Sequence, residues 1–122
     1  MACQILEREG ERCLHLETPV WRAEFVLSNN ANLIRLFHLE TGRELLRTPD
    51  TLAQLRQMPE RFGMPILFPP GRIARGKFRW KDQEYTFPLN DHIHRGNLHG
   101  ILLGEAWDLI SVVEEGTVCE LR

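Results

Sequence analysis

The chain has 122 residues, of which 43% are hydrophobic and 26% are charged, a composition that fits one compact globular unit and excludes a disordered or fibrous protein. Its 15 basic and 17 acidic residues give a net charge of -2, which argues against capture of nucleic acid or of an anionic membrane surface. No apolar stretch has the length needed to span a bilayer, and the N-terminus lacks the charged-then-apolar pattern of a secretion signal. We therefore expect a cytoplasmic protein with no nucleic-acid partner and no membrane partner.

The cysteines point to the same compartment. Cys3, Cys13 and Cys119 lie far apart in the sequence, without the close spacing of a zinc or redox motif. An odd number leaves one thiol over in any disulfide framework. Free, mostly buried thiols in a reducing compartment are the expected state.

Alternation of apolar and polar residues predicts an antiparallel meander in the first 47 residues. Strands are expected around residues 13–15, 21–27, 33–39 and 44–46. Turns are expected at Asn29-Asn30 and Thr41-Gly42, because these residue types favour tight turns between strands.

One helix is expected, over residues 49–58. Thr48 can cap the first amides, Pro49 suits the first helical position, and Asp50 complements the helix dipole. The apolar stripe of this helix consists of Leu52, Leu55 and Met58. A proline and a glycine follow and end it. The proline-rich residues 64–70 should then form an extended, buried connector.

Strand patterns resume after the connector. Further strands are predicted at residues 73–80, 84–87, 106–113 and 118–121. Residues 81–83 and 114–117 should form hairpin turns, and residues 90–97 a polar loop. The last strand would leave an open sheet edge near residues 117–121, where a second chain or the remainder of a longer domain would pair.

The most specific feature is an ordered series of motifs between Gly63 and Trp107. It reads Gly63-Met-Pro-Ile-Leu-Phe-Pro69, Gly71-Arg72-Ile73, Gly76-x-Phe78, Tyr85, Leu89-Asn90 and Asn97-Leu98-His99-Gly100. This order and spacing resemble the aldose 1-epimerases, which have a proline-rich approach, a Gly/Asn-Arg-Ile turn, a Gly-x-Phe…Tyr-x-Leu hairpin and an Asn-x-Leu-His-Gly loop. The strands that precede the series are compatible with the resemblance but less diagnostic.

The resemblance implies a fold. The family fold is an all-β, antiparallel β-sandwich of the galactose mutarotase-like supersandwich type, and the helix near residues 49–58 is its one short helix here. That domain is considerably longer than this chain. Residues 1–122 are therefore expected to form the N-terminal portion of a single domain, with the C-terminal portion absent from this chain.

The resemblance also implies a reaction, the interconversion of aldose anomers in carbohydrate metabolism. A general acid protonates the ring oxygen while a general base removes the anomeric hydroxyl proton, so that the ring opens and recloses. In the family these groups are a His and a Glu from the C-terminal part, and no segment here matches either motif. We expect no catalytic residue in this chain, no cofactor, and a partial binding site for a monosaccharide, phosphorylated or not.

Three residues are candidates for that binding site: Arg72, His99 and Asn97. A guanidinium fork that follows a glycine turn can bond vicinal hydroxyls, although Arg72 could instead pair with an acid on a neighbouring strand. The resemblance implies that His99 holds a sugar hydroxyl, and the alternative is a structural histidine. Asn97, like Asn90, can also shape its loop by bonding its own backbone.

Two alternatives from other classes stay open. Asp91-His92-Ile93-His94 with His99 could ligate a metal in a cupin-like barrel, but Leu98 stands where that pattern needs a carboxylate, and we expect no metal. The second alternative is a non-catalytic carbohydrate-binding or assembly module. Function belongs to the site rather than to the fold, so the resemblance alone leaves this alternative open.

Overall fold

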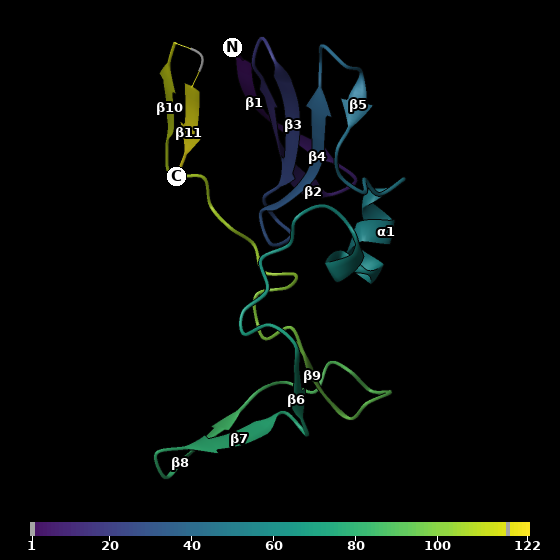
Figure 1. Cartoon of the computed structure of the whole chain (residues 1–122), viewed down its shortest axis with the longest axis vertical. Helices are drawn as coiled ribbons and strands as arrows, with labels where there is room; N and C mark the ends of the chain where they lie inside the picture. The colour runs from purple at the N-terminus through teal and green to yellow at the C-terminus, as the bar shows by residue number, and fades with distance from the viewer. Residues whose placement is uncertain (1, 117) are drawn as a thin grey trace. The chain divides into compact units, whose positions relative to one another are not determined.

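The computed structural model describes residues 2–116 and 118–122, and the chain divides into two compact units. The first unit comprises Met1–Pro65 and Gly104–Arg122, and the second comprises Ile66–Leu103. Every strand pairing within a sheet is antiparallel. The prediction of an antiparallel, mainly β fold with one short α-helix is confirmed (Figure 1).

A five-stranded sheet with the order β1-β2-β3-β4-β5 forms the body of the first unit. Its strands are β1 (Ala2–Arg8), β2 (Glu11–Glu17), β3 (Trp21–Val26), β4 (Asn32–His38) and β5 (Arg43–Glu44). The predicted meander is thus confirmed. It gains β1, which the sequence pattern did not indicate, and β5 begins one residue earlier than expected and ends two residues earlier.

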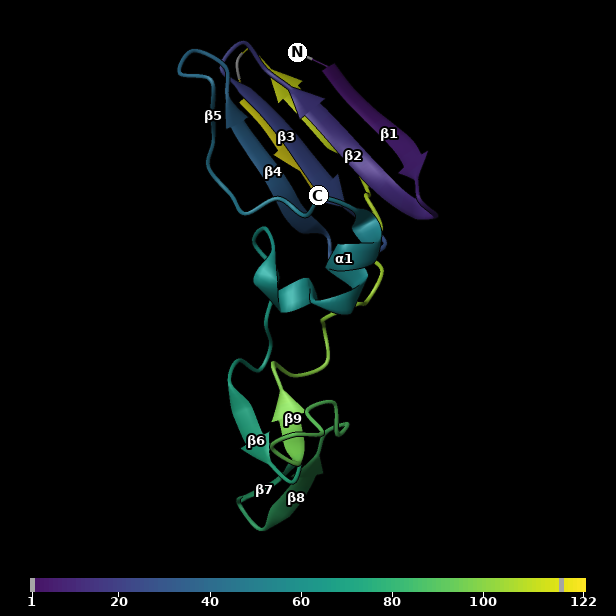
Figure 2. The same ribbon diagram turned by 90° about the vertical axis from the view of Figure 1, so that its right-hand side faces the viewer.

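The helical segment lies at one end of this sheet (Figure 2). Helix α1 spans Leu52–Gln57 and a 3-10 turn, η1, follows at Pro59–Arg61. The two leucines of the helix, Leu52 and Leu55, are fully buried. They pack in one core with Cys13, Val26, Ile34 and Phe62, so burial of apolar surface fixes the helix on the sheet.

The N-cap prediction was wrong by one turn. The Thr51 hydroxyl accepts the Gln54 amide at 3.1 Å and caps α1. The Thr48 hydroxyl instead donates to the Ile34 carbonyl at 2.8 Å. Both threonines have capping chemistry, and the contact of Thr48 with β4 decides between them. No helix in the described residues is long and apolar enough to cross a membrane.

The C-terminal hairpin of the first unit consists of β10 (Val112–Glu115) and β11 (Val118–Leu121). The predicted strand over residues 106–113 is mostly irregular, because the backbone there bonds to the β3–β4 connection. The Trp107 amide donates to the Leu27 carbonyl at 2.8 Å, and the Asn30 amide donates to the Glu105 carbonyl at 2.6 Å. The expected turn over residues 114–117 begins later, since residues 114 and 115 belong to β10, and Thr117 lies outside the described residues.

The second unit contains two small antiparallel sheets. The first pairs β6 (Arg72–Ala74) with β9 (Gly96–Leu98), and the second pairs β7 (Lys77–Trp80) with β8 (Gln83–Thr86). The predicted strand over residues 73–80 is interrupted by a turn in which Arg75 and Gly76 both have positive φ. The predicted loop over residues 90–97 ends two residues earlier, because residues 96 and 97 belong to β9.

The connector over residues 64–70 is extended but not buried, which corrects the prediction. Met64 is 57% exposed and Phe68 is 64% exposed. The chain passes from the first unit to the second after Pro65. Its prolines cannot complete a sheet ladder, and its side chains alternate between exposed and half-buried.

Candidate functional site

The β6–β9 ladder brings two of the predicted binding residues together. Arg72 is in register with Leu98, so Gly71-Arg72 lies beside Leu98-His99. The His99 amide donates to the Gly71 carbonyl at 2.8 Å. The Gly71 amide donates in return to Nδ1 of the His99 ring at 3.2 Å. Gly71 and His99, which are 28 positions apart in the sequence, therefore lie together at one edge of the site.

This contact fixes the tautomer of His99. A ring nitrogen that accepts a backbone N–H carries no proton, so the neutral imidazole holds its proton on Nε2. Nε2 is then a hydrogen-bond donor that points away from Gly71. The ring is half-buried and the residue has a positive φ of 61°, which is uncommon for a side chain of this size. The turn holds His99 in this conformation.

Arg72 pairs with an acid, as the structural alternative predicted, although this acid, Asp91, lies in the loop before β9 and not on a neighbouring strand. Its Nε lies 3.0 Å from Oδ2 of Asp91, and the Arg72 side chain remains 57% exposed. Among the described residues this ion pair uses Nε, which leaves the terminal nitrogens of the fork for a ligand. The pairing with Asp91 orients the guanidinium and does not exclude a role in binding, since five N–H donors are available.

Asp91 also contacts the ring of His94. Nδ1 of His94 lies 2.9 Å from Oδ2 and 3.1 Å from Oδ1 of Asp91. Partial burial pushes the pKa of Asp91 upward, but hydrogen bonds from Arg72 and His94 outweigh it and hold the pKa at about 2. Asp91 is therefore a carboxylate at neutral pH and a permanent counter-charge for Arg72.

The third candidate, Asn97, lies beneath the surface. It is 0% exposed. Its Nδ2 donates to the carbonyls of Pro88 at 2.8 Å and Gly100 at 3.1 Å, and its Oδ1 accepts the Gly100 amide at 2.9 Å. Asn97 thus closes the turn that carries His99, as the loop-shaping alternative predicted, and a contact with sugar stays a prediction.

Asn90 likewise holds β9 by side-chain hydrogen bonds to its backbone, but from an exposed position. Its Nδ2 donates to the Leu98 carbonyl at 3.0 Å, and its Oδ1 accepts the Leu98 amide at 2.7 Å. This side chain takes the place of a neighbouring strand. Gly100 completes the turn with a φ of 78°, and a Cβ there would overlap the Phe68 carbonyl, so no larger residue fits.

The histidines of this loop do not assemble into a metal centre. Among the described residues, no group of three or more His, Cys, Asp or Glu side chains is placed to hold a metal ion. His94 turns its Nδ1 to Asp91, and the His99 Nδ1 accepts the Gly71 amide.

Sequence reasoning did not assign Asp91 to Arg72, or Asn90 to Leu98. Asp91 lies 19 positions from Arg72, and the sequence pattern indicates it only as a possible metal ligand in the His-rich segment. The signal that could have found these pairs is the register of β6 with β9, which no local pattern displays.

Comparisons with known proteins agree with this fold. Residues 31–122 match the model of the aldose 1-epimerase family. The protein YihR of Escherichia coli (strain K12), described as uncharacterized, is 40% identical over 45 residues, which cover 36% of this chain and 15% of that protein. The crystal structure of a galactose mutarotase-like protein from Clostridium acetobutylicum superposes with a TM-score of 0.89 at 22% identity.

The structural match covers a larger share of this chain than of the protein to which it is compared. The superposition covers 98% of this chain but 37% of the Clostridium chain, so the chain spans about a third of the length of its solved relative. The likeness in structure shows that this chain has a galactose mutarotase-like fold. Because the family model matches 92 of the 122 residues, the chain belongs to the aldose 1-epimerase family.

Proposed function

We propose that this chain supplies part of the sugar-binding site of an aldose 1-epimerase-like protein of carbohydrate metabolism. The observation that supports the proposal most directly is the β6–β9 ladder, which sets Arg72 beside His99. Both residues belong to the motifs that resemble the family, and both present hydrogen-bond donors. Sugar hydroxyls accept as well as donate, so they suit such a pair.

Each residue has a distinct role in the proposal. His99 donates from Nε2 to one hydroxyl, because Nδ1 is occupied by the Gly71 amide. Arg72 donates from its terminal nitrogens to neighbouring hydroxyls, while Asp91 holds Nε. Asn97 supports both through the turn that it closes, and it acts as a positioning residue.

We further propose that residues 1–122 form the N-terminal portion of a single galactose mutarotase-like domain. The share of the Clostridium chain that the superposition covers supports this division. The general acid and base would then come from residues outside this chain. The free side of β11, which pairs only with β10 among the described strands, is the edge that the rest of the domain or a second chain would join.

A titration of the isotope-labelled 122-residue chain with galactose and with glucose tests the binding proposal. Chemical-shift changes should centre on Gly71, Arg72 and His99, with weak affinity. Arg72→Ala and His99→Ala should each weaken binding about tenfold, as expected for the loss of a hydrogen bond to a charged or fixed donor.

Matched controls separate binding from general damage. Arg79→Ala and His92→Ala remove the same side-chain types from exposed positions of the same unit and should leave the affinity unchanged. Polarimetry on freshly dissolved α-glucose should show no mutarotation by this chain above the uncatalysed rate. Equal affinity in all four variants would refute the site, and fast equilibration would refute the absence of the catalytic pair.

A further inference from the structure

Two cysteines from opposite ends of the chain lie on the same side of the five-stranded sheet. Cys3 of β1 is in register with Leu16 of β2, and Leu16 is in register with Ala23 of β3. Residues paired across strands project from the same face. Leu16 and Ala23 line a groove of about 390 Å³ together with Cys119 of β11. The groove therefore joins the row that begins at Cys3 to the C-terminal hairpin.

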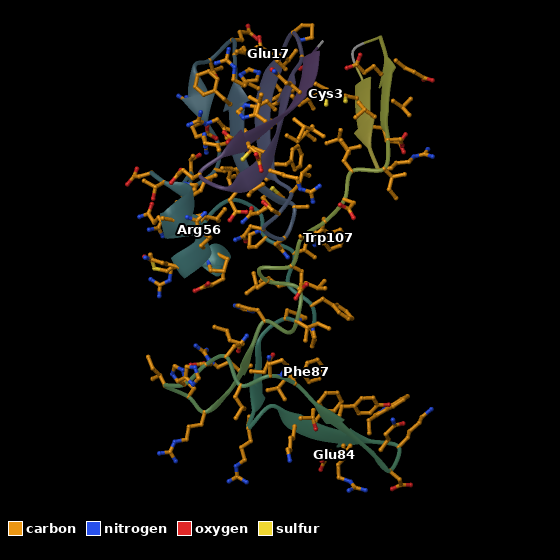
Figure 3. The ribbon with its side chains drawn as sticks, turned by 180° about the vertical axis from the view of Figure 1, so that it is seen from behind. Cys3, Glu17, Arg56, Glu84, Phe87 and Trp107 are labelled. Carbon is orange, nitrogen blue, oxygen red and sulfur yellow. The ribbon has the colours of Figure 1, made fainter. Side chains whose placement is uncertain are left out.

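The views of the first unit support this placement. The β10–β11 hairpin lies along one face of the sheet in Figures 1 and 2. Figure 3 shows Cys3 projecting from β1 toward the hairpin. Cys3 and Cys119 are both free and half-buried. Each thiol is therefore reachable by a small reagent.

The third cysteine has a different environment. Cys13 is in register with Leu6 and with Val26, so it projects from the opposite face of the sheet. There it is fully buried in the core beneath α1. It serves as an internal reference, because it has the same chemistry without access to the hairpin.

The electrostatic environment agrees with close approach of the two half-buried thiols. Burial raises the pKa of Cys3, and the neighbouring Cys119 and Glu114 raise it further. Burial and Glu114 likewise raise the pKa of Cys119, with which Glu114 is in register. Thiolates are the reactive species, so both thiols should be slow to react at neutral pH and faster as the pH rises toward 9 and above.

From this geometry we infer that Cys3 and Cys119 form a thiol pair at which oxidation joins β1 to β11 by an intramolecular disulfide. In the proposed step an oxidising disulfide such as oxidised glutathione accepts two electrons and becomes two thiols. Cys3 and Cys119 each lose a proton as their sulfur atoms bond, through a mixed-disulfide intermediate. The product fastens the hairpin to the face of the sheet. This inference concerns the first unit and does not depend on the sugar-binding proposal.

Incubation of the reduced 122-residue chain with excess oxidised glutathione at pH 8.5, followed by trypsin digestion without reductant, tests the pair. Cleavage after Arg8, Arg12, Arg22 and Arg95 places the three cysteines in separate peptides, 1–8, 13–22 and 96–122. Mass spectrometry should find peptide 1–8 joined to peptide 96–122 as the main product. The rate of joining should increase from pH 7 to pH 9.

Substitutions show which thiols are needed. Cys3→Ser and Cys119→Ser should each abolish the joined peptide, and Cys13→Ala should retain it. Amide hydrogen exchange over residues 112–121 should slow in the oxidised chain. The inference is overturned if glutathione remains on both Cys3 and Cys119 without joining them, if peptide 1–8 joins peptide 13–22 or another copy of itself, or if exchange over the hairpin is unchanged by oxidation.

Discussion

The buried amide of Asn97 offers a direct test of how the turn that carries His99 is held. Asn97→Asp keeps the size of the side chain and the acceptor for the Gly100 amide, but removes both N–H donors. The carbonyls of Pro88 and Gly100, now 2.8 and 3.1 Å from Nδ2, would then face a carboxylate. A buried acceptor without a partner costs about 1–3 kcal/mol. The Gly100 carbonyl is such an acceptor, whereas the contact with Pro88 is part-buried and should cost less. Together with the desolvation of the new charge, the total should be about 3 kcal/mol.

Amide hydrogen exchange at His99 and Gly100 measures this cost locally. A loss of about 3 kcal/mol accelerates exchange more than a hundredfold, since each 1.4 kcal/mol corresponds to a factor of ten. Burial raises the pKa of an introduced carboxyl, so stability should recover as the pH falls below that raised value and decline as the pH rises through it. This direction follows because the neutral acid can again donate one hydrogen bond.

Asn90 provides the matched control for this experiment. It makes the same kind of paired contact with Leu98, but its side chain is exposed. Water can replace its lost donor, so Asn90→Asp should accelerate exchange by less than about tenfold. If the two substitutions have equal effects, or if Asn97→Asp changes exchange by less than tenfold at neutral pH, burial of the amide is not what holds the turn.

Three further predictions concern other parts of the chain. The carboxyl of Asp91 should titrate in NMR with a midpoint of about 2. Its ion pair therefore stabilises the fold fully above the ordinary pKa of 3.8, and this stabilisation is lost as the pH falls through about 2. A midpoint near 4 would contradict the pairing. Gly63→Ala should cost about 3 kcal/mol or more in urea unfolding, because φ is +64° and a Cβ would lie 2.9 Å from Cα of Ile34. Gly10→Ala, with a similar φ but nothing within 4 Å, should cost only about 1–2 kcal/mol. Thr51→Ala should cost about 1 kcal/mol through loss of the helix cap, and an unchanged unfolding midpoint would refute that role.

The sequence pattern predicted the central strands of the first sheet because each is an apolar-rich stretch partly interleaved with polar residues, and turn residues such as Asn29-Asn30 and Thr41-Gly42 separate these stretches. The sequence pattern did not predict β1, and the reason is physical. Ile5 and Leu6 are adjacent and apolar, and they pair with Leu14 and Cys13 on opposite faces of the sheet. A strand with apolar residues on both faces loses the alternation on which the prediction depends.

The motifs located the site, but the contacts within it depend on tertiary structure. The motif resemblance points to Arg72 and His99, and their proximity follows from the register of β6 with β9. The partner of Arg72 could be named only as an acid on a neighbouring strand. Asp91 takes that place because its own backbone bonds to Gly96, next to the ladder. Pairing at this distance along the chain has no local signature.

The second unit depends on polar contacts, and not on a buried apolar core, for its stability. Its buried residues are Gly76, Gly96, Asn97 and Gly100, with no buried apolar side chain among residues 66–103. Hydrophobic burial dominates the stability of most folded units, whereas a hydrogen bond contributes only about 1 kcal/mol net. The positions of His99 and Arg72 therefore depend on a few backbone and amide contacts. It follows that substitution of a buried polar residue here should damage the site more than substitution of the exposed aromatic side chains on β7.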